Sequence, residues 1–461
     1  MMGDTSDTIA AISTALGPAG IGVIRVSGPC ALSTTLQVFR SVSGRRPRNR
    51  EATFGHLVDP GDGSHVDEAM MTYMAAPNTY TREDVVELSC HGGIAAVRAA
   101  LRCVLDAGAR QAAPGEFTLR AFLNGRIDLA QAEAVADVVR APTDLTLRAA
   151  GKQLTGALSR QVRSVRADCL DLLAQMEAEI DFTDDDVPAL PRAELRAKLA
   201  AMAENIGRSL DGSSEGILLR HGLRLAIVGS PNVGKSSILN ALLRSDRAIV
   251  TNLPGTTRDV LEETFSLDGI PVVVVDTAGI RGTDDPAEAE GVERSKRALA
   301  DADLVLLVLD SSKSVSHSDR AVSLLVREST KRALVVLNKM DLPVRSTAED
   351  AAGMVPVAAV STCALSEEGV EPLREAIIHE IGTGRLSAGE LPLVSNERHR
   401  EALVRAGEHV ESSLQAVRES LPSDFVSIGL QGAVRELGQI TGEDATEDLL
   451  DNIFAKFCIG K

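Results

Sequence analysis

The sequence contains no tryptophan, and aromatic residues make up only 2% of its 461 residues. The hydrophobic cores must therefore be built from alanine, leucine and valine, and abundant Ala and Leu favours helix. Hydrophobic residues nevertheless account for 44% of the chain, which is enough for ordinary globular cores. The length predicts about three domains.

Cysteine and histidine patterns typical of metal sites are also missing. The six cysteines form no C-x-x-C pair, and their spacing resembles neither a zinc site nor a disulfide framework. This usage suits a reducing cytosol. No secretory signal pattern stands at the start, and no apolar run approaches the ~20 residues of a membrane span. We therefore expect a cytoplasmic protein without a membrane segment.

Positive charge is in short supply, because the formal net charge is −17. This balance argues against a protein that grips nucleic acid by broad charge neutralisation, although a local patch remains compatible with RNA contact. The run Arg45–Arg50 is one basic spot, and a solvated loop explains it adequately.

The spacing of apolar residues changes along the chain. The first 125 residues alternate short apolar runs with Gly/Pro turns, which predicts an α+β domain with strands Ile21–Val26 and Val85–Ser89 and a helix Ile94–Leu105. Helical spacing then continues to about residue 219, in three predicted stretches: Asp128–Arg140, Leu145–Ile180 and Arg192–Leu219.

A second change of texture begins at residue 224. Helical stretches separate five candidate strands, which predicts a parallel sheet with crossover helices: Arg224–Val228, Val272–Val275, Leu304–Leu309, Ala333–Leu337 and Val355–Val360. Helical texture returns after residue 384, in Asn396–Glu419, Phe425–Ile440 and Thr446–Phe457. The simplest arrangement is an α/β domain inserted into a helical domain whose two halves pair in space.

The segment Gly229–Ser236 fits the phosphate-binding pattern G-x-x-x-x-G-K-[ST]. It follows a predicted strand and precedes an apolar helix, Ile238–Leu243, which is the context that the motif requires. Backbone N–H groups and the helix N-terminus would face the phosphates. Lys235 would neutralise the outer phosphates, and Ser236 would supply an oxygen to Mg²⁺.

Two tetrapeptides at strand ends extend this site. Asp276–Gly279 follows the Val272–Val275 strand, so its carboxylate can hold the metal through water and its glycine can sense the γ-phosphate. Asn338–Asp341 follows the Ala333–Leu337 strand, where an aspartate can accept both hydrogen bonds from N1 and the amino group of guanine. Adenine lacks that donor pair, so Asp341 selects GTP over ATP.

Two further loops complete the expected nucleotide site. Gly255–Asp259 lies between the phosphate loop and Asp276, and Thr256 or Thr257 would complete the Mg²⁺ shell in the GTP state. The last base-contacting loop is expected at Cys363–Leu365, where GTPases of this class usually begin with serine.

Water activation must differ from that of small signalling GTPases. They place a glutamine directly after the D-x-x-G motif to orient water, and this chain has Ile280 there. The following loop is rich in acidic residues, any of which can also serve only as a solubilising charge: Asp284, Asp285, Glu288 and Glu290. A monovalent cation bound by Asn232, Thr251 and nearby carbonyls would supply the charge that an arginine finger provides elsewhere.

The whole chain resembles the tRNA modification GTPase MnmE (TrmE) family. The matching segments run from one end of the chain to the other, and the last is the most specific: Asp7–Ile12, Gly20–Gly28, Glu83–Leu88, His91–Gly93, Pro114–Asn124 and Phe457–Lys461. The resemblance implies a multidomain α/β fold, with an α+β folate-binding-type domain, a discontinuous all-α domain and an inserted Ras-like P-loop GTPase domain. The implied boundaries are 1–125 for the tetrahydrofolate-binding and dimerisation domain, 126–218 and 383–461 for the helical domain, and 219–382 for the G domain.

The resemblance also implies roles for individual residues. Glu288 would orient the attacking water, by alignment through Gly291–Arg294. The potassium ligands would be Asn232, Thr251, Leu253 and Thr256, and the magnesium ligands Ser236 and Thr257. The folate contacts would be Arg25, Glu87, Arg126 and Lys461. The full set of expected GTP-binding residues is Asn232, Val233, Gly234, Lys235, Ser236, Ser237, Thr251, Asn252, Leu253, Pro254, Gly255, Thr256, Thr257, Asp276, Thr277, Ala278, Gly279, Asn338, Lys339, Met340, Asp341, Cys363, Ala364 and Leu365.

The implied pathway installs a carboxymethylaminomethyl or aminomethyl group on carbon 5 of the wobble uridine of certain tRNAs. The implied partner is the flavoprotein MnmG (GidA), the one-carbon unit comes from 5,10-methylenetetrahydrofolate or a formyl analogue, and the protein forms a homodimer. Cys458 is either a thiol nucleophile or a small buried residue that shapes the folate pocket.

Two other functions share some of these motifs. A ribosome-assembly GTPase would act only as a binding switch, but the sequence shows neither an RNA-binding KH pattern nor a second P-loop. A folate-dependent aminomethyl-transfer enzyme with an accessory switch would rest on the N-terminal domain alone.

Overall fold

A computed structural model describes residues 6–181, 190–245, 263–275, 296, 298–329, 331–366, 368–382 and 390–461. The chain divides into two compact units. One unit comprises Met1–Ala136, Gln153–Met202 and Arg405–Lys461, and the other comprises Asp137–Lys152 and Ala203–Val404. Within the described ranges, no helix combines the length and the apolar character needed to cross a membrane.

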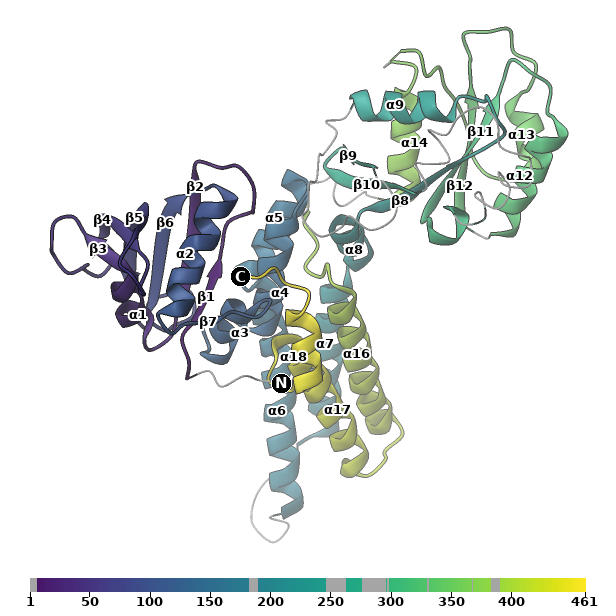
Figure 1. Ribbon diagram of the computed structural model, residues 1–461. Helices are drawn as coiled ribbons and strands as arrows, with labels where there is room; N and C mark the ends of the chain where they lie inside the picture. The colour runs from purple at the N-terminus through teal and green to yellow at the C-terminus, as the bar shows by residue number, and fades with distance from the viewer. Residues whose placement is uncertain are drawn as a thin grey trace. The chain divides into compact units, whose positions relative to one another are not determined.

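The first unit contains a seven-stranded sheet in the order β3-β4-β5-β6-β2-β1-β7 (Figure 1). Neighbouring strands are antiparallel except for the parallel pair β1 and β7. The strands are β1 Ile9–Ile12, β2 Ile21–Ser27, β3 Phe39–Ser41, β4 Ala52–Val58, β5 His65–Met74, β6 Val85–His91 and β7 Arg110–Gln111. The two strands expected from the sequence are β2 and β6, and the α+β character of this region is confirmed.

Alternation along these strands gives the sheet two different faces. On one face, Ile24 and Val26 of β2 are buried beneath helices α1 (Ala31–Val38) and α2 (Ile94–Asp106). On the opposite face, β1 is covered by helix α3 (Glu116–Leu123), whose Phe117 is fully buried. Because side chains alternate, Arg25 faces the α3 side of the sheet.

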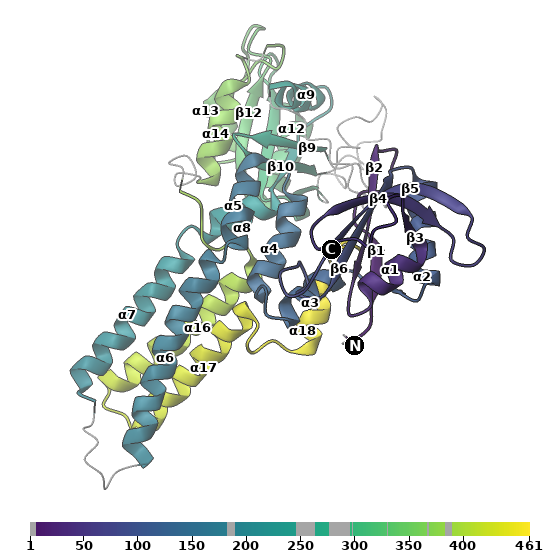
Figure 2. The same ribbon diagram turned by 90° about the vertical axis from the view of Figure 1, so that its left-hand side faces the viewer.

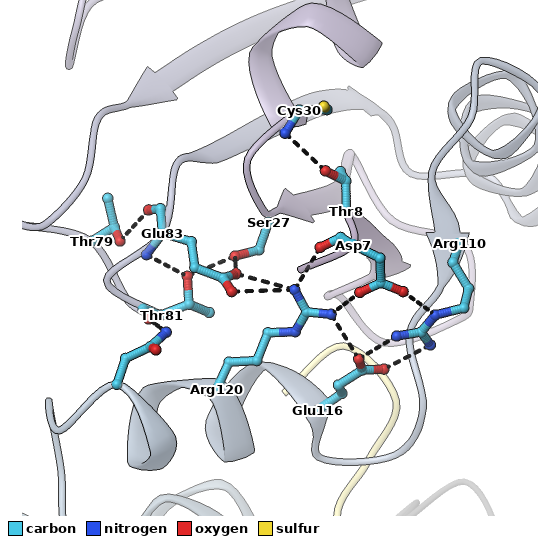
Figure 3. A network of polar contacts seen from close by, with 11 residues as sticks. Asp7, Thr8, Ser27, Cys30, Thr79, Thr81, Glu83, Arg110, Glu116 and Arg120 are labelled. Carbon is cyan, nitrogen blue, oxygen red and sulfur yellow. Dashed lines mark hydrogen bonds and ion pairs between the residues drawn. The ribbon is translucent and has the colours of Figure 1, made fainter. Parts of the chain in front are cut away.

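A buried arginine ties α3 to the strands (Figure 3). The Arg120 side chain is only 1% exposed, and its guanidinium pairs with Asp7, with Glu83 at 3.2 Å and with Glu116 at 3.0 Å. Arg110 joins the same cluster through Glu116 at 2.5 Å and Asp7 at 2.6 Å. Burial raises the pKa of the Glu116 carboxyl, but the hydrogen bonds from the two arginines outweigh it and leave the pKa below its ordinary value. Glu116 is therefore ionised at neutral pH.

The helices of the chain follow the predicted helical stretches, two of which are divided. The stretch Leu145–Ile180 forms α5 (Asp144–Leu154) and α6 (Ala157–Asp181), and Gly156 between them adopts a left-handed conformation with φ +77°. The segment Arg192–Leu219 likewise divides into α7 (Arg192–Leu210) and α8 (Ser213–His221), with Gly212 at φ +73° between them. The predicted helix at Asp128–Arg140 is α4, Leu129–Arg140.

Helices that are far apart in the sequence pair in the first unit (Figure 2). Helix α6 runs beside α17 (Ser423–Thr441), and Arg166 of α6 pairs with Asp444 just after α17, at 3.3 Å. Helix α16 (Glu397–Arg418) packs with α17 through Arg405 and Glu436 at 2.8 Å. The two halves of the helical region therefore lie together, as expected for a domain that carries an insertion.

The last helix of the chain packs against α3 and α4 within the first unit. Helix α18 (Glu447–Phe454) buries Leu450, Ile453 and Phe454 against Leu129 of α4. Gly115, at the start of α3, has no room for a side chain, because an added Cβ would lie 2.8 Å from the carbonyl oxygen of Phe454. The C-terminal tail is thus held beside the N-terminal sheet.

The second unit contains a six-stranded sheet in the order β13-β12-β11-β8-β10-β9. The strands are β8 Leu223–Val228, β9 Glu263–Leu267, β10 Ile270–Val275, β11 Leu304–Asp310, β12 Arg332–Asn338 and β13 Ala359–Ser361. All pairings are parallel except that of β9 with β10, so the expected parallel sheet gains one antiparallel edge strand. The predicted strand Val355–Val360 was too long, because Val355 caps helix α13 (Ala348–Met354).

Helices cover both faces of this sheet, as its unbroken apolar strands require (Figure 1). Helices α9 (Lys235–Ser245) and α14 (Glu371–Ile381) pack on one face. Helices α12 (His317–Glu328) and α13 pack on the other. The carboxyl ends of the parallel strands consequently share one edge, where ligands bind in this class of fold.

We predict that replacing Arg120 by Met destabilises the first unit, because three carboxylates would remain partly buried without their cation. The opening free energy of the β1 and β2 amides should fall by about 3 kcal/mol, as measured by native-state hydrogen exchange. The matched control is Arg48→Met, since the Arg48 side chain is 77% exposed and lies 4.0 Å from Glu51. Equal protection in both variants would contradict the structural role of Arg120.

Candidate functional site

The phosphate-binding loop joins β8 to α9 at the carboxyl edge of the second sheet. Its glycines are required by close approach: a Cβ on Gly229 would lie 2.4 Å from the carbonyl oxygen of Val308, and a Cβ on Gly234 would lie 2.2 Å from Asn338 Nδ2. Gly234 also has φ +100°, which disfavours any other residue. The loop therefore adopts a backbone conformation that only this spacing of glycines permits.

Lys235, the first residue of α9, lies over this loop. Its Nζ donates hydrogen bonds to the carbonyl oxygens of Gly229 and Ser230, both at 2.8 Å. Burial lowers the pKa of Lys235. A polyphosphate would be a stronger partner than two neutral carbonyls, because its negative charge adds direct attraction to the lysine ammonium.

The motif Asn338–Asp341 begins at the end of β12 and reaches back to the phosphate loop. Asn338 is buried, and its Nδ2 donates to the carbonyl oxygen of Val233 at 3.0 Å. The Nζ of Lys339 donates to the carbonyl oxygen of Asn232 at 2.8 Å. Two consecutive motif residues therefore bind two consecutive carbonyls of the phosphate loop, which joins the two predicted parts of the site.

The third loop, Cys363–Leu365, lies against the same motif. The Sγ of Cys363 is 3.4 Å from Asp341 Oδ1, and the backbone N–H of Ala364 donates to Asn338 Oδ1 at 3.4 Å. The backbone N–H of Met340 donates to the carbonyl oxygen of Thr362 at 3.2 Å. Cysteine thus keeps the contact to Asp341 that a serine hydroxyl would make in its place. Leu365 is 80% exposed at the edge of the loop.

Other expected residues of this site lie outside the described part of the chain. They are Thr251, Asn252, Leu253, Pro254, Gly255, Thr256, Thr257, Asp276, Thr277, Ala278, Gly279 and Glu288. Ser236 and Ser237 lie in the first turn of α9, next to Lys235.

A second cluster of charged and aromatic residues lies on the α3 side of the N-terminal sheet. Arg25 and Glu87 are directly opposite each other on β2 and β6, and their side chains pair at 2.8 and 3.0 Å. The Arg25 side chain is 18% exposed and that of Glu87 is 32% exposed, so the pair remains accessible.

Tyr80 brings a third predicted residue to this cluster. The Tyr80 ring lies 5.3 Å from the Arg25 guanidinium and 4.7 Å from that of Arg126, which is cation–π distance. The Tyr80 hydroxyl bonds to Thr118 Oγ1 at 2.9 Å, which fixes the ring against α3. Phe117 lies 5.8 Å from Arg25 on the same side. The two arginines expected from the sequence are thus brought together by one aromatic ring.

The C-terminal tail approaches the same sheet at β1. The Ser13 hydroxyl donates to the carbonyl oxygen of Gly460 at 3.1 Å, and a Cβ on Gly460 would lie 2.2 Å from the carbonyl oxygen of Ile12. The tail therefore carries Lys461 beside the N-terminal sheet. Cys458 is exposed, so the interpretation of this residue as a small buried group was wrong.

Sequence reasoning missed two residues that the geometry singles out. Tyr80 is one of only two tyrosines in the chain, and its rarity in a protein so poor in aromatics could have marked it as a candidate site residue. Asp310 ends β11 and pairs with Lys339 at 2.7 Å. Its position at the carboxyl end of a buried strand was the corresponding signal.

We predict that Asp341→Asn weakens GTP binding by at least about a hundredfold, because an amide cannot accept both guanine hydrogen bonds. Equilibrium binding of a fluorescent GTP analogue measures the change. The matched control is Cys363→Ser, which keeps a donor next to Asp341 and should bind GTP as the unmodified chain does. Undiminished GTP affinity in Asp341→Asn would exclude a base-recognition role.

Comparison with known families and proteins covers nearly the whole chain. The family described as the GTP-binding protein TrmE N-terminus matches residues 8–126, and the MnmE helical domain family matches residues 129–458. Among solved structures, the G domain of the T. maritima FeoB iron transporter is 27% identical to this chain. The match covers 34% of this chain and 98% of that one, with a TM-score of 0.27.

Curated relatives share both the length and the sequence of this chain. The tRNA modification GTPase MnmE of Alkaliphilus metalliredigens is 46% identical over 459 residues, which is 99% of each chain. That of Chloroflexus aurantiacus is 48% identical over 458 residues, or 99% of this chain and 100% of the relative. With two matching domain families and such full-length identity, this chain belongs to the tRNA modification GTPase MnmE family.

Proposed function

We propose that this chain is a GTPase that acts in the modification of the wobble uridine of tRNA. The observation that carries the proposal is the direct connection between the phosphate loop and the Asn338–Asp341 motif, through the carbonyl oxygens of Asn232 and Val233. This connection supports a site in which the phosphate loop would bind phosphates beside a carboxylate, that of Asp341, that would select guanine, in a chain whose relatives are named tRNA modification GTPase MnmE.

The described residues fit a guanine nucleotide. Lys235 presents a partly buried cation to the loop, and Gly234 leaves room for Asn338 to pack against it. Ser236 and Thr257 would hold Mg²⁺, which supplies positive charge to the phosphates when bound. Asp341 would accept the hydrogen bonds of the guanine edge, with the Cys363 loop beside it.

Hydrolysis requires a group that orients the attacking water. Because Ile280 stands where small signalling GTPases have glutamine, another residue must do so. We assign this role to Glu288. Asn232, Thr251, Leu253 and Thr256 would hold K⁺, which supplies charge beside the β- and γ-phosphates when bound. Of these four residues, Asn232 lies in the described part of the chain, and its backbone has φ +63°, a conformation uncommon outside glycine.

The N-terminal cluster fits a folate derivative such as 5,10-methylenetetrahydrofolate or its formyl analogue. Glu87 offers a carboxylate to the donor edge of a pterin, while the exposed Arg126 and the terminal Lys461 offer cations to a glutamate tail. Arg25 already pairs with Glu87 and would keep that carboxylate oriented. The Tyr80 ring adds an aromatic surface on which the two arginines are stacked.

We propose that different segments of the chain have different functions. Residues 1–125 would bind the folate and form the homodimer, residues 219–382 would form the G domain, and residues 126–218 and 383–461 would connect them. The flavoprotein MnmG (GidA) would be the partner in forming the carboxymethylaminomethyl or aminomethyl group at carbon 5 of the uridine, in the cytoplasm. Exposed Cys458 would be available as a thiol nucleophile.

We predict that GTP hydrolysis depends on K⁺ and is at least about tenfold slower in Na⁺, because charge next to the phosphates stabilises the transition state. Steady-state phosphate release at equal ionic strength measures the rates. Nucleotide affinity, measured in both salts, is the control for binding. Equal rates in the two salts would contradict the cation assignment.

We predict that cells lacking this protein lose the modified wobble uridines. Mass spectrometry of tRNA nucleosides measures the loss. The unmodified gene should restore them, and Glu288→Ala, which keeps the nucleotide-binding residues, should not. Unchanged uridines in the deletion strain would instead favour a ribosome-assembly GTPase that acts only as a binding switch.

A further inference from the structure

Asp310 is a buried carboxylate at the end of β11 that belongs to none of the nucleotide-binding motifs. The residue is 8% exposed, and it stands at the sheet edge where the phosphate loop and the Asn338–Asp341 motif meet. A charged group with so little exposure is costly to bury and must be matched by specific partners.

Those partners are the ammonium group of Lys339 and the hydroxyl and backbone N–H of Ser312. Asp310 Oδ2 accepts a hydrogen bond from Lys339 Nζ at 2.7 Å, and Oδ1 accepts from the hydroxyl and backbone N–H of Ser312 at 2.6 and 3.1 Å. Burial raises the pKa of Asp310, but the hydrogen bonds from Lys339 and Ser312 outweigh it and leave the pKa below its ordinary value. The carboxylate is therefore charged wherever the protein is folded near neutral pH.

Lys339 needs such an anchor because its own conformation is unfavourable. Its backbone has φ +65°, in the left-handed region that costs free energy for a residue with a side chain. Its Nζ is shared between Asp310 and the carbonyl oxygen of Asn232, at 2.7 and 2.8 Å. Asn232 is itself left-handed, with φ +63°. A strained lysine thus holds a strained loop residue, and Asp310 is the charged partner of that lysine.

Ser311, which directly follows β11, supports the neighbouring motif residue, Asn338. Ser311 donates both its hydroxyl and its backbone N–H to the carbonyl oxygen of Asn338, at 2.7 and 3.0 Å. Asn338 in turn holds the carbonyl oxygen of Val233. Asp310 at the end of β11 and Ser311 just after it therefore support two consecutive residues of the motif, which hold two consecutive carbonyls of the phosphate loop.

We propose that Asp310 is a positioning residue for nucleotide binding, which fixes Lys339 across the phosphate loop and so links the guanine-recognition loop to the phosphate cradle. The proposal rests on the GTP binding proposed above. A loop whose carbonyls of Asn232 and Val233 are held away from the ligand keeps its N–H groups directed toward the phosphates. Asp310 would act through Lys339 and would not touch the nucleotide itself.

The test is the affinity and dissociation rate of N-methylanthraniloyl-GDP from the full chain carrying Asp310→Asn. This change removes the charge at nearly constant volume. The dissociation rate should rise by at least about tenfold, because a charge-assisted hydrogen bond to a buried partner is lost. Asp310→Glu, which keeps the carboxylate, should recover most of the affinity. Lys313→Ala is the matched control, because Lys313 Nζ lies 3.6 Å from the same carboxylate but its side chain is 69% exposed.

A double-mutant cycle separates positioning from simple packing. In a Lys339→Met background, Asp310→Asn should cost almost nothing further, since its partner is already gone. Additive losses in the cycle would overturn the proposal, as would a dissociation rate for Asp310→Asn within about twofold of the unmodified chain. Failure of the unmodified chain to bind the GDP probe would instead refute the proposed function, so the two failures are distinguishable.

Discussion

The nucleotide site depends on one constraint: the backbone of the phosphate loop must turn its carbonyls away from the ligand and its N–H groups toward it. Asn338 and Lys339 meet this constraint by holding the carbonyl oxygens of Val233 and Asn232 at 3.0 and 2.8 Å. The glycines at 229 and 234 make the path sterically allowed, and the paired side chains make it stable. Because the same four-residue motif carries Asp341, the proposed selection of guanine and binding of phosphate would share one support.

The first unit solves a related problem with buried charge. Arg120 balances the carboxylates of Asp7, Glu83 and Glu116, and this cluster fixes α3 against the sheet. Helix α3 in turn supplies Thr118, which orients the Tyr80 ring between the two arginines of the proposed folate site. In both units, a buried charged residue, Arg120 or Asp310, holds neighbouring side chains of a proposed site in place.

Much of this could be predicted from the sequence, and the exceptions have physical causes. Strands β8, β10 and β12 are runs of buried apolar residues followed by motif residues, and β11 is a buried apolar run of the same kind without a motif, so all four could be predicted. Strand β9 was missed because its five residues bury only Phe265 and Leu267, too short a pattern to identify. The break at Gly156 between α5 and α6 was missed because apolar spacing continues on both sides of it.

The sites show the same division. Motifs identify residues that contact the ligand, since the ligand restricts their type and spacing. Supporting residues such as Tyr80 and Asp310 are restricted only by neighbours that the chain brings from elsewhere: Asp310 is 29 residues from Lys339, and Arg25 lies opposite a residue 62 positions away. Their roles become visible only when β11 is placed beside β12 and β2 beside β6.

The central claim is that GTP hydrolysis drives tRNA modification. The most direct measurement is formation of the modified wobble uridine by the purified chain with its flavoprotein partner, a tetrahydrofolate one-carbon donor and unmodified tRNA. With GTP the modification should accumulate over many turnovers, and with a non-hydrolysable GTP analogue it should stop at or before one turnover per protein. Equal accumulation with the two nucleotides would contradict the account, because binding alone would then suffice.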